Sequence, residues 1–495
     1  MAEVELKLEL PPEEHAAFRK LVALAGAAPH RTRLFALYFD TPRHDLARRA
    51  MALRLRRSAG AWKQALKAGA SGSGGLHARE EWEHERPDAS IDLAAFAATP
   101  LASLPRARKL HETLGEIFRV EVARTTWRIE LAPGTSVEVA LDRGVVRHGG
   151  ASAPISEVEI ESLEGEPLAV FDFAERIVGD IALRPSALTK AERGYRLARG
   201  EKLAPTKARQ VAMDGAMAPA QGARAAIAAA LRQLQDNEAG MLATRDPEFV
   251  HQMRIALRRL RSALRAFRKA TGPDLEAQVR ADLHWITQAT GSARDLDVLA
   301  TETLPAMRAA DPGGDTGALV RRLAARRRQA LEAVRSAVMS PRYARLMLNF
   351  AKWLASPAAA NGASATDLRR FADRALAKRH ARWLHAAQGI GTMAAAERHR
   401  VRIGAKRLRY VADGFARLYR RKDMDGYLEA LSKVQDGLGR ANDAAVAERL
   451  LAELAAPAAI AAFARGWLAA ETRSSLEHIA RDVKRVRRTA PWEKN

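Results

Sequence analysis

The sequence predicts an α+β multidomain protein in which an antiparallel β domain precedes an all-α domain. In residues 1 to about 200, apolar and charged side chains alternate with the period of two that half-buried strands show. From about residue 220 onward, alanine, leucine and arginine dominate, and apolar residues recur every three or four positions, as in amphipathic helices. The chain has 495 residues, and a prior of roughly 150 residues per domain suggests roughly two to four domains.

The amino-acid composition excludes some kinds of functional site and favours some kinds of binding partner. The absence of cysteine excludes disulfides, thiolate zinc sites and cysteine nucleophiles. A net charge of +23 favours polyanionic partners: nucleic acid, an anionic membrane surface or polyphosphate. Aromatic residues make up only 5% of the chain, which disfavours a single-strand nucleic-acid binder. No apolar run approaches the roughly 20 residues of a membrane span and no leader-like segment opens the chain, so we expect a cytoplasmic protein without a membrane partner.

The β half opens on the stretch "EVELK", in which Glu3, Glu5 and Lys7 share one face of a strand and apolar residues occupy the other. The glycine-serine stretch at 69–75 predicts a hairpin loop, and a helix is expected around 92–117. Other strands with a charged face are "MALRLRR", "REEWEHE", "TTWRIEL", "TSVEVALDRG" and "ISEVEIE". An antiparallel sheet with one solvent-facing side would explain any one of them.

Taken together, the charged strands indicate something more specific. Acidic clusters fall on some strands and basic clusters on others, so a sheet closed into a barrel could line its interior with both. Carboxylates would then hold hard divalent cations, and Lys and Arg would hold phosphate oxygens. This arrangement suits metal-assisted phosphoryl chemistry.

These strands resemble the CYTH domain, the triphosphate tunnel metalloenzymes, over about 195 residues. The resemblance rests on "EVELK", "YFDTP" (38–42), "LRLRR" (53–57), "LK" (66–67), "ALDRG" (140–144), "ISEVEIE" (155–161) and "LTKAERGY" (188–195). It implies an eight-stranded antiparallel tunnel with flanking helices that hydrolyses triphosphate with Mg²⁺ or Mn²⁺. The chain is most similar to the inorganic triphosphatase branch, which typically carries a C-terminal helical domain.

The resemblance also implies roles for individual residues. The catalytic residues it implies are Glu3, Glu5 and Lys7, and the metal ligands are Glu5, Asp142, Glu157 and Glu159. The phosphate-binding residues it implies are Lys7, Arg54, Arg56, Lys67, Arg124, Lys190 and Arg193. Glu81, Glu83 and Glu161 are further acidic candidates. Thr126 stands where many members of the family have a second basic residue.

The helical half contains an internal repeat. "HQMRIALRRLR" (251–261) matches "HRVRIGAKRLR" (399–409) at an offset of 148 residues. The same offset aligns Gly291, Ala293 and Asp295 with Gly439, Ala441 and Asp443. One offset that aligns two separated patches indicates duplication of a helical unit.

Each repeat carries a basic stripe beside an apolar stripe at helical spacing. Like charges four residues apart on a helix each cost about 0.2–0.5 kcal/mol, and ordinary solvated faces avoid this cost by mixing in acidic residues. A bound polyanion would offset it, so we favour a ligand over a solvated face. The basic stripes consist of His251, Arg254, Arg258, Arg261, Arg265 and Arg268 in the first repeat, and of His399, Arg402, Lys406 and Arg409 in the second.

These helices resemble the CHAD domain, through "VHQMRIALRRLR", "ARDLDVL", "KRLRY" and "VQDGLGRANDA". The resemblance covers about 220–490. It implies two pseudo-symmetric four-helix bundles whose basic helices line a shared channel that binds inorganic polyphosphate. Asp295, Asp297 and Asp443 are either ligands or, as we favour, acids that orient arginines. Asn442 replaces Arg294 in the second repeat.

The predicted domains are a triphosphate tunnel at 1–200, a linker at 201–219 and a helical polyphosphate-binding domain at 220–490, with repeat units at about 220–350 and 365–490. The predicted function is hydrolysis of tripolyphosphate to pyrophosphate and phosphate, with triphosphate and polyphosphate as partners and no specific nucleic acid. Three alternatives stay open: a non-catalytic polyphosphate-binding or granule-associated protein, a triphosphatase for thiamine triphosphate or nucleotides, and a nucleic-acid binder. The sequence indicates no oligomeric state.

Overall fold

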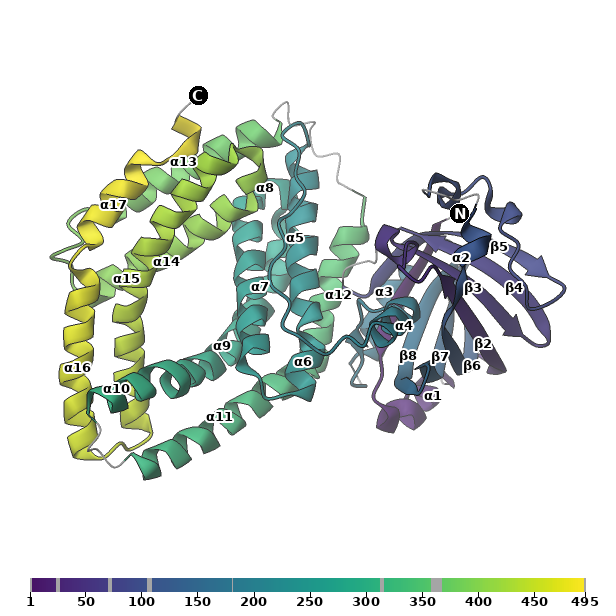
Figure 1. The fold of residues 1–495 in the computed structure, drawn as a ribbon, viewed down its shortest axis with the longest axis horizontal. Helices are drawn as coiled ribbons and strands as arrows, with labels where there is room; N and C mark the ends of the chain where they lie inside the picture. Colours follow the sequence, from purple (N-terminus) through teal and green to yellow (C-terminus); the bar gives the residue numbers. More distant parts are fainter. Residues whose placement is uncertain are drawn as a thin grey trace. The chain divides into compact units, whose positions relative to one another are not determined.

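The structure, a computed structural model, describes residues 2–23, 27–69, 74–104, 109–179, 181–311, 316–357 and 367–493 (Figure 1). It divides into two compact units. The first consists of Met1–Leu203 with Val338–Pro357, and the second of Ala204–Ala337 with Ala358–Asn495. Most of the predicted glycine-serine loop at 69–75 lies outside the described residues.

The first unit is built on one antiparallel sheet. Its strands follow the order β5-β4-β3-β2-β6-β7-β8-β1-β9, and β5 also pairs with β1, which closes eight of the described strands into a barrel. The predicted eight-stranded antiparallel tunnel is therefore confirmed as a fold. The strands are β1 (Ala2–Glu9), β2 (His30–Asp40), β3 (Met51–Ser58), β4 (Ala61–Ala68), β5 (Leu76–Arg86), β6 (Gly115–Ala132), β7 (Thr135–His148), β8 (Ala151–Glu164) and the short β9 (Arg184–Pro185).

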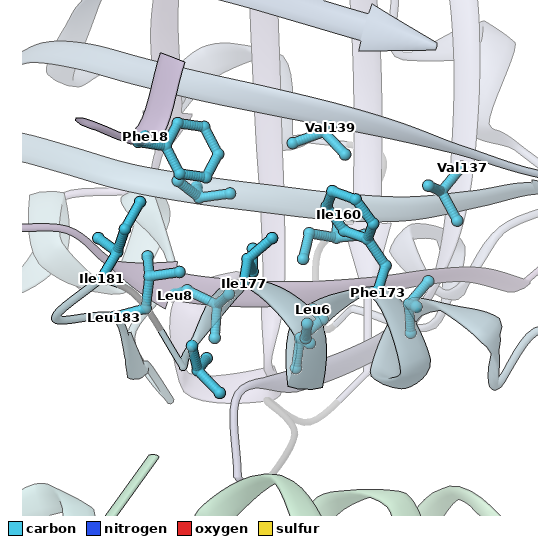
Figure 2. Packing of buried hydrophobic residues seen from close by; sticks show 14 of the residues in the cluster. Leu6, Leu8, Phe18, Val137, Val139, Ile160, Phe173, Ile177, Ile181 and Leu183 are labelled. Atoms are coloured by element: carbon cyan, nitrogen blue, oxygen red, sulfur yellow. The ribbon is translucent and has the colours of Figure 1, made fainter. Parts of the chain in front are cut away.

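An apolar core covers the outer face of β1, β7 and β8. Leu6 and Leu8 of β1 pack there with Phe173 and Ile177 of α3 (Figure 2). The helices of this unit are α1 (His15–Ala23), α2 (Leu110–Thr113), α3 (Ala169–Ile177), α4 (Lys190–Ala198) and α12 (Pro341–Ala355). Burial of this outer face leaves the opposite, charged face of the same strands to line the barrel interior.

Helix α12 belongs to this core, although it lies far along the chain from the strands. Ala344, Leu348 and Ala351 recur at spacings of four and three, form one face of the helix and are all buried in the same cluster. Lys352 adds an ion pair with Asp172 of α3 at 2.6 Å. The first unit is thus completed by a segment from the helical half of the sequence.

The helix predicted around 92–117 is wrong. The described residues of this segment form two 3₁₀ turns, Ala94–Phe96 and Pro100–Ser103, and the single turn of α2, before β6 begins at Gly115. Pro100 lacks an N–H donor and favours a turn start, and Thr99 caps that turn by accepting a hydrogen bond from Leu101. Phe96 is fully buried, so the apolar residues that suggested a helix instead anchor turns in a core cluster with Leu53 of β3 and Leu66 of β4.

The second unit is all-helical in its described part, as predicted. Its helices are α5 (Pro219–Asp236), α6 (Glu238–Ala243), α7 (Pro247–Ala266), α8 (Arg268–Thr271), α9 (Pro273–Val298), α10 (Leu304–Ala310), α11 (Gly317–Val338), α13 (Leu368–Ala386), α14 (Ala395–Gly414), α15 (Arg421–Glu453), α16 (Ala458–Leu476) and α17 (Ile479–Arg488). None of the described helices is long and apolar enough to cross a membrane.

The predicted repeat reappears in the helix boundaries. Helices α7 and α14 begin and end at positions 148 residues apart, and α9 and α15 begin at the same offset. Helices α7 and α14 pack directly against each other. Phe267 and Phe415 follow these two helices at equivalent positions, and their rings meet edge to face at 5.2 Å. The apolar stripes of both helices are buried, as expected of core positions.

Candidate active site

A charged cavity of about 490 Å³ runs through the barrel of the first unit. All eight strands of the barrel contribute side chains to it, because alternate residues of each strand point inward. Its cationic lining consists of Lys7, Arg54, Arg56, Lys67, Arg79, Arg124 and Lys190, and its acidic lining of Glu5, Glu81, Glu83, Glu138, Glu159 and Glu161. The predicted mixture of both signs is therefore present in one cavity.

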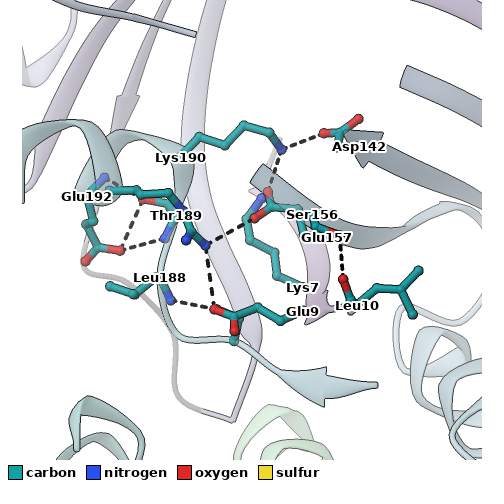
Figure 3. Close-up of polar contacts among 12 residues, drawn as sticks. Lys7, Glu9, Leu10, Asp142, Ser156, Glu157, Leu188, Thr189, Lys190 and Glu192 are labelled. Carbon is teal, nitrogen blue, oxygen red and sulfur yellow. Dashed lines mark hydrogen bonds and ion pairs between the residues drawn. The ribbon is translucent and has the colours of Figure 1, made fainter. Parts of the chain in front are cut away.

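Three carboxylates gather on one side of the barrel. Asp142 on β7 pairs in register with Glu157 on β8, and Glu159 follows on the same face of β8. One oxygen from each of the three lies within 4.8 Å of the others. Lys190, at the start of α4, lies 2.6 Å from Asp142 and 2.6 Å from Glu157 (Figure 3). It also lies 2.7 Å from Glu159. Arg124 on β6 forms a fork with Asp142, at 2.7 and 2.6 Å.

These cations keep the buried carboxylates ionised. Burial alone would raise the pKa of Asp142 and of Glu159, but Lys190 and Arg124 outweigh it and lower both pKa values. Burial likewise opposes the charge of Lys190, yet the three carboxylates raise its pKa well above the ordinary value. Because Asp142 and Glu159 are almost fully buried, their ionised state depends on this network.

The donor set suits a hard divalent cation. The cluster offers only carboxylate oxygens, which Mg²⁺ and Mn²⁺ prefer. Oε2 of Glu157 is buried and accepts no hydrogen bond from the described residues, because the Arg193 guanidinium lies 3.7 Å away, beyond hydrogen-bond distance. Among the described residues, Asp142, Glu157 and Glu159 form a group that fits a metal ion, and the predicted metal role of Glu5 stays a prediction.

The opening strand supplies one face of the cavity. Lys7 lies between two acids: Nζ is 2.7 Å from Glu5 and also forms an ion pair with Glu159. Burial and the nearby charge of Glu159 raise the pKa of Glu5 to about 7. A carboxylate of this pKa can accept a proton near neutral pH. The backbone of Glu3 belongs to β1, but its side chain lies outside the described part of the structure.

A second row of paired charges follows β3, β4 and β5. Arg54 lies 3.0 Å from Glu81, and Lys67 lies 2.8 Å from the other oxygen of the same carboxylate. Arg56 lies 3.2 Å from Glu83. Glu81 and Glu83, which the sequence suggested as acidic candidates, therefore act here as partners of predicted phosphate-binding cations.

Some predicted site residues lie outside the cavity lining. Arg193 pairs with Glu9 at 3.6 Å and with Glu157 at 3.7 Å, and none of these three residues lines the cavity. Asp142 is fully buried behind the lining. Thr126 pairs in register with Ala140 and also lies outside the lining.

Three polar residues of the cavity were not predicted from the sequence: His77, Arg79 and Thr189. Continuing the alternation of Glu81 and Glu83 backward along β5 leads to Arg79 and His77, so period-two counting could have found both. Thr189 caps α4 in a capping box with Glu192, and this places Lys190 at the first position of the helix.

The second unit brings the two basic stripes together. Arg258 of α7 interacts electrostatically with Arg402 and Lys406 of α14, and Arg254 of α7 interacts with Lys406. Within the described residues, Arg254, Arg258 and Lys406 form no ion pair, and Arg402 lies 3.7 Å from Asp443. Burial and the charges of Arg402 and Arg258 lower the pKa of Lys406 to about 7. We call Arg254, Arg258, Arg402 and Lys406 the basic cluster.

The remaining stripe residues lie around this cluster. Arg261 and Arg265 line a second cavity of about 450 Å³. His251 is half-buried, and burial lowers its pKa. His399 is exposed and lies 2.8 Å from Asn442, the residue that replaces an arginine in the second repeat.

The remaining predicted residues of the helical half, one arginine and three aspartates, each interact with a different side chain. Arg409 donates to Gln435 at 3.4 Å. Asp297 pairs with Arg327 at 2.7 Å. Asp295 interacts electrostatically with Arg254, as Asp443 does with Arg402, so two of the three predicted acids face arginines of the basic cluster.

Comparison with known proteins identifies both halves of the chain. Residues 1–195 match the family model of the CYTH domain, and residues 225–452 match that of the CHAD domain. The chain carries a CYTH domain followed by a CHAD domain. The order and extent of the two matches agree with the resemblances seen in the sequence motifs.

Individual relatives resemble one half or the other. An inorganic triphosphatase of Haemophilus influenzae is 31% identical over 203 residues. The matched region covers 40% of this chain and 55% of the length of the relative, so the chain spans only about half of that protein. The CHAD domain of the plant Ricinus communis is 35% identical, with a TM-score of 0.50 over 57% of this chain and 96% of that one. A putative adenylyl cyclase from Hippeastrum with a dominant triphosphatase activity is 24% identical, with a TM-score of 0.28 over 41% of this chain and 98% of its own.

Proposed function

We propose that the CYTH domain is a metal-dependent inorganic triphosphatase that hydrolyses tripolyphosphate to pyrophosphate and phosphate. The observation that carries the proposal is the cavity, in which seven cations and an adjacent cluster of three carboxylates meet. Cations suit the charged oxygens of a phosphate chain, and carboxylates suit a divalent metal. The similarity to the Haemophilus influenzae triphosphatase supports the same assignment.

The residues divide the chemistry between them. Lys7, Arg54, Arg56, Lys67, Arg79, Arg124 and Lys190 bind phosphate oxygens, and their fixed charges stabilise charge that develops on the leaving pyrophosphate. Glu5, whose raised pKa lies near neutrality, takes the proton of the attacking water. Asp142, Glu157 and Glu159 hold Mg²⁺ or Mn²⁺, which when bound supplies Lewis-acid polarisation of the phosphoanhydride. Arg193 supports Glu157 from outside the cavity.

A substrate profile tests this proposal. Phosphate release is measured from tripolyphosphate, long-chain polyphosphate, ATP and thiamine triphosphate, with Mg²⁺, with Mn²⁺ and with excess EDTA. We expect tripolyphosphate to be hydrolysed fastest and EDTA to abolish the reaction. Faster hydrolysis of ATP or thiamine triphosphate would assign the tunnel to an organic triphosphate. Binding of tripolyphosphate without hydrolysis would favour the non-catalytic alternative.

We further propose that the CHAD domain binds inorganic polyphosphate. The supporting observation is the basic cluster, in which three of the four cations form no ion pair among the described residues. Such a cluster is destabilised by repulsion unless a polyanion binds it. Binding would recruit polyphosphate to the enzyme, raise its local concentration and associate the protein with polyphosphate granules.

A paired charge reversal tests the second proposal. Arg254→Glu with Arg402→Glu should lower polyphosphate affinity and reduce the salt dependence of binding, because fewer cations are displaced from the ligand. The matched control, Arg400→Glu with Arg421→Glu, changes the net charge equally at two exposed arginines outside the basic cluster. Equal losses in both variants would mean that only overall charge matters. Displacement of polyphosphate by duplex DNA at physiological salt would favour the nucleic-acid alternative.

A further inference from the structure

His77 has a place in the tunnel that the proposed mechanism does not use. It lies on β5, directly opposite Glu5 of β1 in the strand register, so both side chains project from the same face of the sheet. Its side chain lines the cavity and is only 3% exposed. A histidine this deeply buried beside a row of lysines and arginines needs an explanation in terms of its hydrogen bonds.

The hydrogen bond of one ring nitrogen settles the state of the other. Nε2 of His77 lies 3.1 Å from the backbone carbonyl oxygen of Ser186. A carbonyl oxygen can only accept, so Nε2 carries the proton and donates it. Nδ1 is then an unprotonated acceptor, and it is buried without a hydrogen-bond partner among the described residues. Burial and the nearby charge of Lys7 lower the pKa of His77 to about 3, which agrees with a neutral ring.

The chemistry of the cavity indicates which donor fits Nδ1. Phosphate oxygens are acceptors and would repel its lone pair. Lys7 already donates to Glu5 and Glu159. A water molecule has two O–H donors, which match two neighbouring acceptors, the Glu5 carboxylate and Nδ1 of His77.

We infer that His77 is a positioning residue for hydrolysis: its Nδ1 accepts a hydrogen bond from the attacking water and orients that water beside Glu5. The inference rests on the proposed triphosphatase function. The water oxygen bonds to the terminal phosphorus while the bridging P–O bond breaks. One water proton passes to Glu5, and pyrophosphate leaves with the electron pair of the broken bond. The second O–H of the water stays directed at Nδ1, so the lone pair faces the phosphorus.

Three substitutions in the full chain separate this role from a structural one. His77→Gln keeps an amide N–H that can reach the Ser186 carbonyl but offers no acceptor at the place of Nδ1. His77→Asn offers an acceptor near Nδ1 but does not reach Ser186. His77→Phe fills the same space and offers neither group. Thermal unfolding of each variant, followed alongside its kinetics, reports the structural cost.

The inference predicts that kcat for tripolyphosphate falls about 10- to 100-fold in His77→Phe and in His77→Gln, with KM little changed. It predicts that His77→Asn retains more activity than His77→Gln, even if it is the less stable protein. The opposite order, with activity following stability, would show that only the Ser186 contact matters and overturn the inference. Equal activity in wild type and all three variants would overturn it as well.

A tautomer measurement gives an independent readout. In ¹⁵N spectra of histidine side chains, the signal that disappears in His77→Gln should show a protonated Nε2 and an unprotonated Nδ1. A protonated Nδ1 would overturn the inference whatever the kinetics. A wild type that releases no phosphate from tripolyphosphate would refute the proposed function, and this inference with it. An active wild type with unaffected variants would refute the inference alone.

Discussion

Lys406 should make polyphosphate binding depend on pH in the neutral range. Its pKa of about 7 in the ligand-free protein means that it is about nine-tenths protonated at pH 6 and about one-tenth at pH 8. The facing charged groups are Arg402 on its own helix, Arg254 and Arg258 on α7, and Asp443 on α15. A bound polyanion would stabilise the charged form, so binding is coupled to proton uptake.

The size of the effect follows from the protonated fraction. If the complex keeps Lys406 charged throughout, affinity falls about tenfold between pH 6 and pH 8. Titration calorimetry with long-chain polyphosphate at fixed ionic strength measures this ratio, and buffers of different ionisation enthalpy count the protons taken up. Lys406→Arg should flatten the profile, because an arginine stays charged, while the other titrating groups are the same in both proteins. Profiles of equal steepness in wild type and Lys406→Arg would refute the reasoning.

The lowered pKa of Lys406 also makes the free energy of unfolding depend on pH. The folded pKa of Lys406 lies below its unfolded value of 10.5, so the unfolded chain binds more protons between those two pH values. Stability contributed by this group therefore rises with pH across that window and is lowest below pH 7. Lys406→Met should stabilise the helical unit at pH 6 by up to a few kcal/mol while it weakens polyphosphate binding. Denaturant unfolding of wild type and Lys406→Met at pH 6 and pH 10 measures whether the substitution stabilises the protein and at which pH it does so. A Lys406→Met variant that is less stable than wild type at pH 6 would contradict this prediction.

Two further predictions concern the first unit. Leu348→Ala should destabilise the tunnel by about 2–5 kcal/mol, because Leu348 is fully buried in the core that also contains Leu6 and Leu8 of β1. The denaturation midpoint, followed by the fluorescence of a tunnel tryptophan such as Trp127, measures this loss, and an unchanged midpoint would show that α12 is dispensable. Gly194→Ala should displace α4, because an added Cβ would lie 2.1 Å from the ring of Phe118. We expect about 1–3 kcal/mol of lost stability, and slower phosphate release because Lys190 lies on the same helix; full activity would contradict this prediction.

Period-two alternation was a reliable guide to the tunnel because each residue of a barrel strand has only two directions available. It predicted the inward face of β1, and the same rule extended along β5 reaches Arg79 and His77. It could not indicate that α12 would complete the tunnel core. The stripe of Ala344, Leu348 and Ala351 predicts a buried face but contains nothing about which surface covers it.

Where a local sequence pattern gave a wrong or incomplete prediction, contacts with distant parts of the chain explain the difference. The apolar residues of 92–117 are spaced widely enough to suggest a helix, yet Pro100 and the close start of β6 leave room only for turns. The lowered pKa of Lys406 arises from its burial and from nearby cations, among them Arg258, which lies 148 residues earlier in the sequence. A repeat indicates that two stripes exist, whereas their mutual contact depends on the packing of α7 against α14.

The central claim is that the tunnel hydrolyses tripolyphosphate and that Glu5 takes the proton of the attacking water. The most direct test compares metal-dependent phosphate release by the wild type and by Glu5→Gln, with unfolding midpoints to show that both are folded. The account predicts release by the wild type and a fall of about 10²–10⁴-fold in Glu5→Gln. A folded wild type that releases no phosphate above background, or a Glu5→Gln variant as active as the wild type, would contradict it.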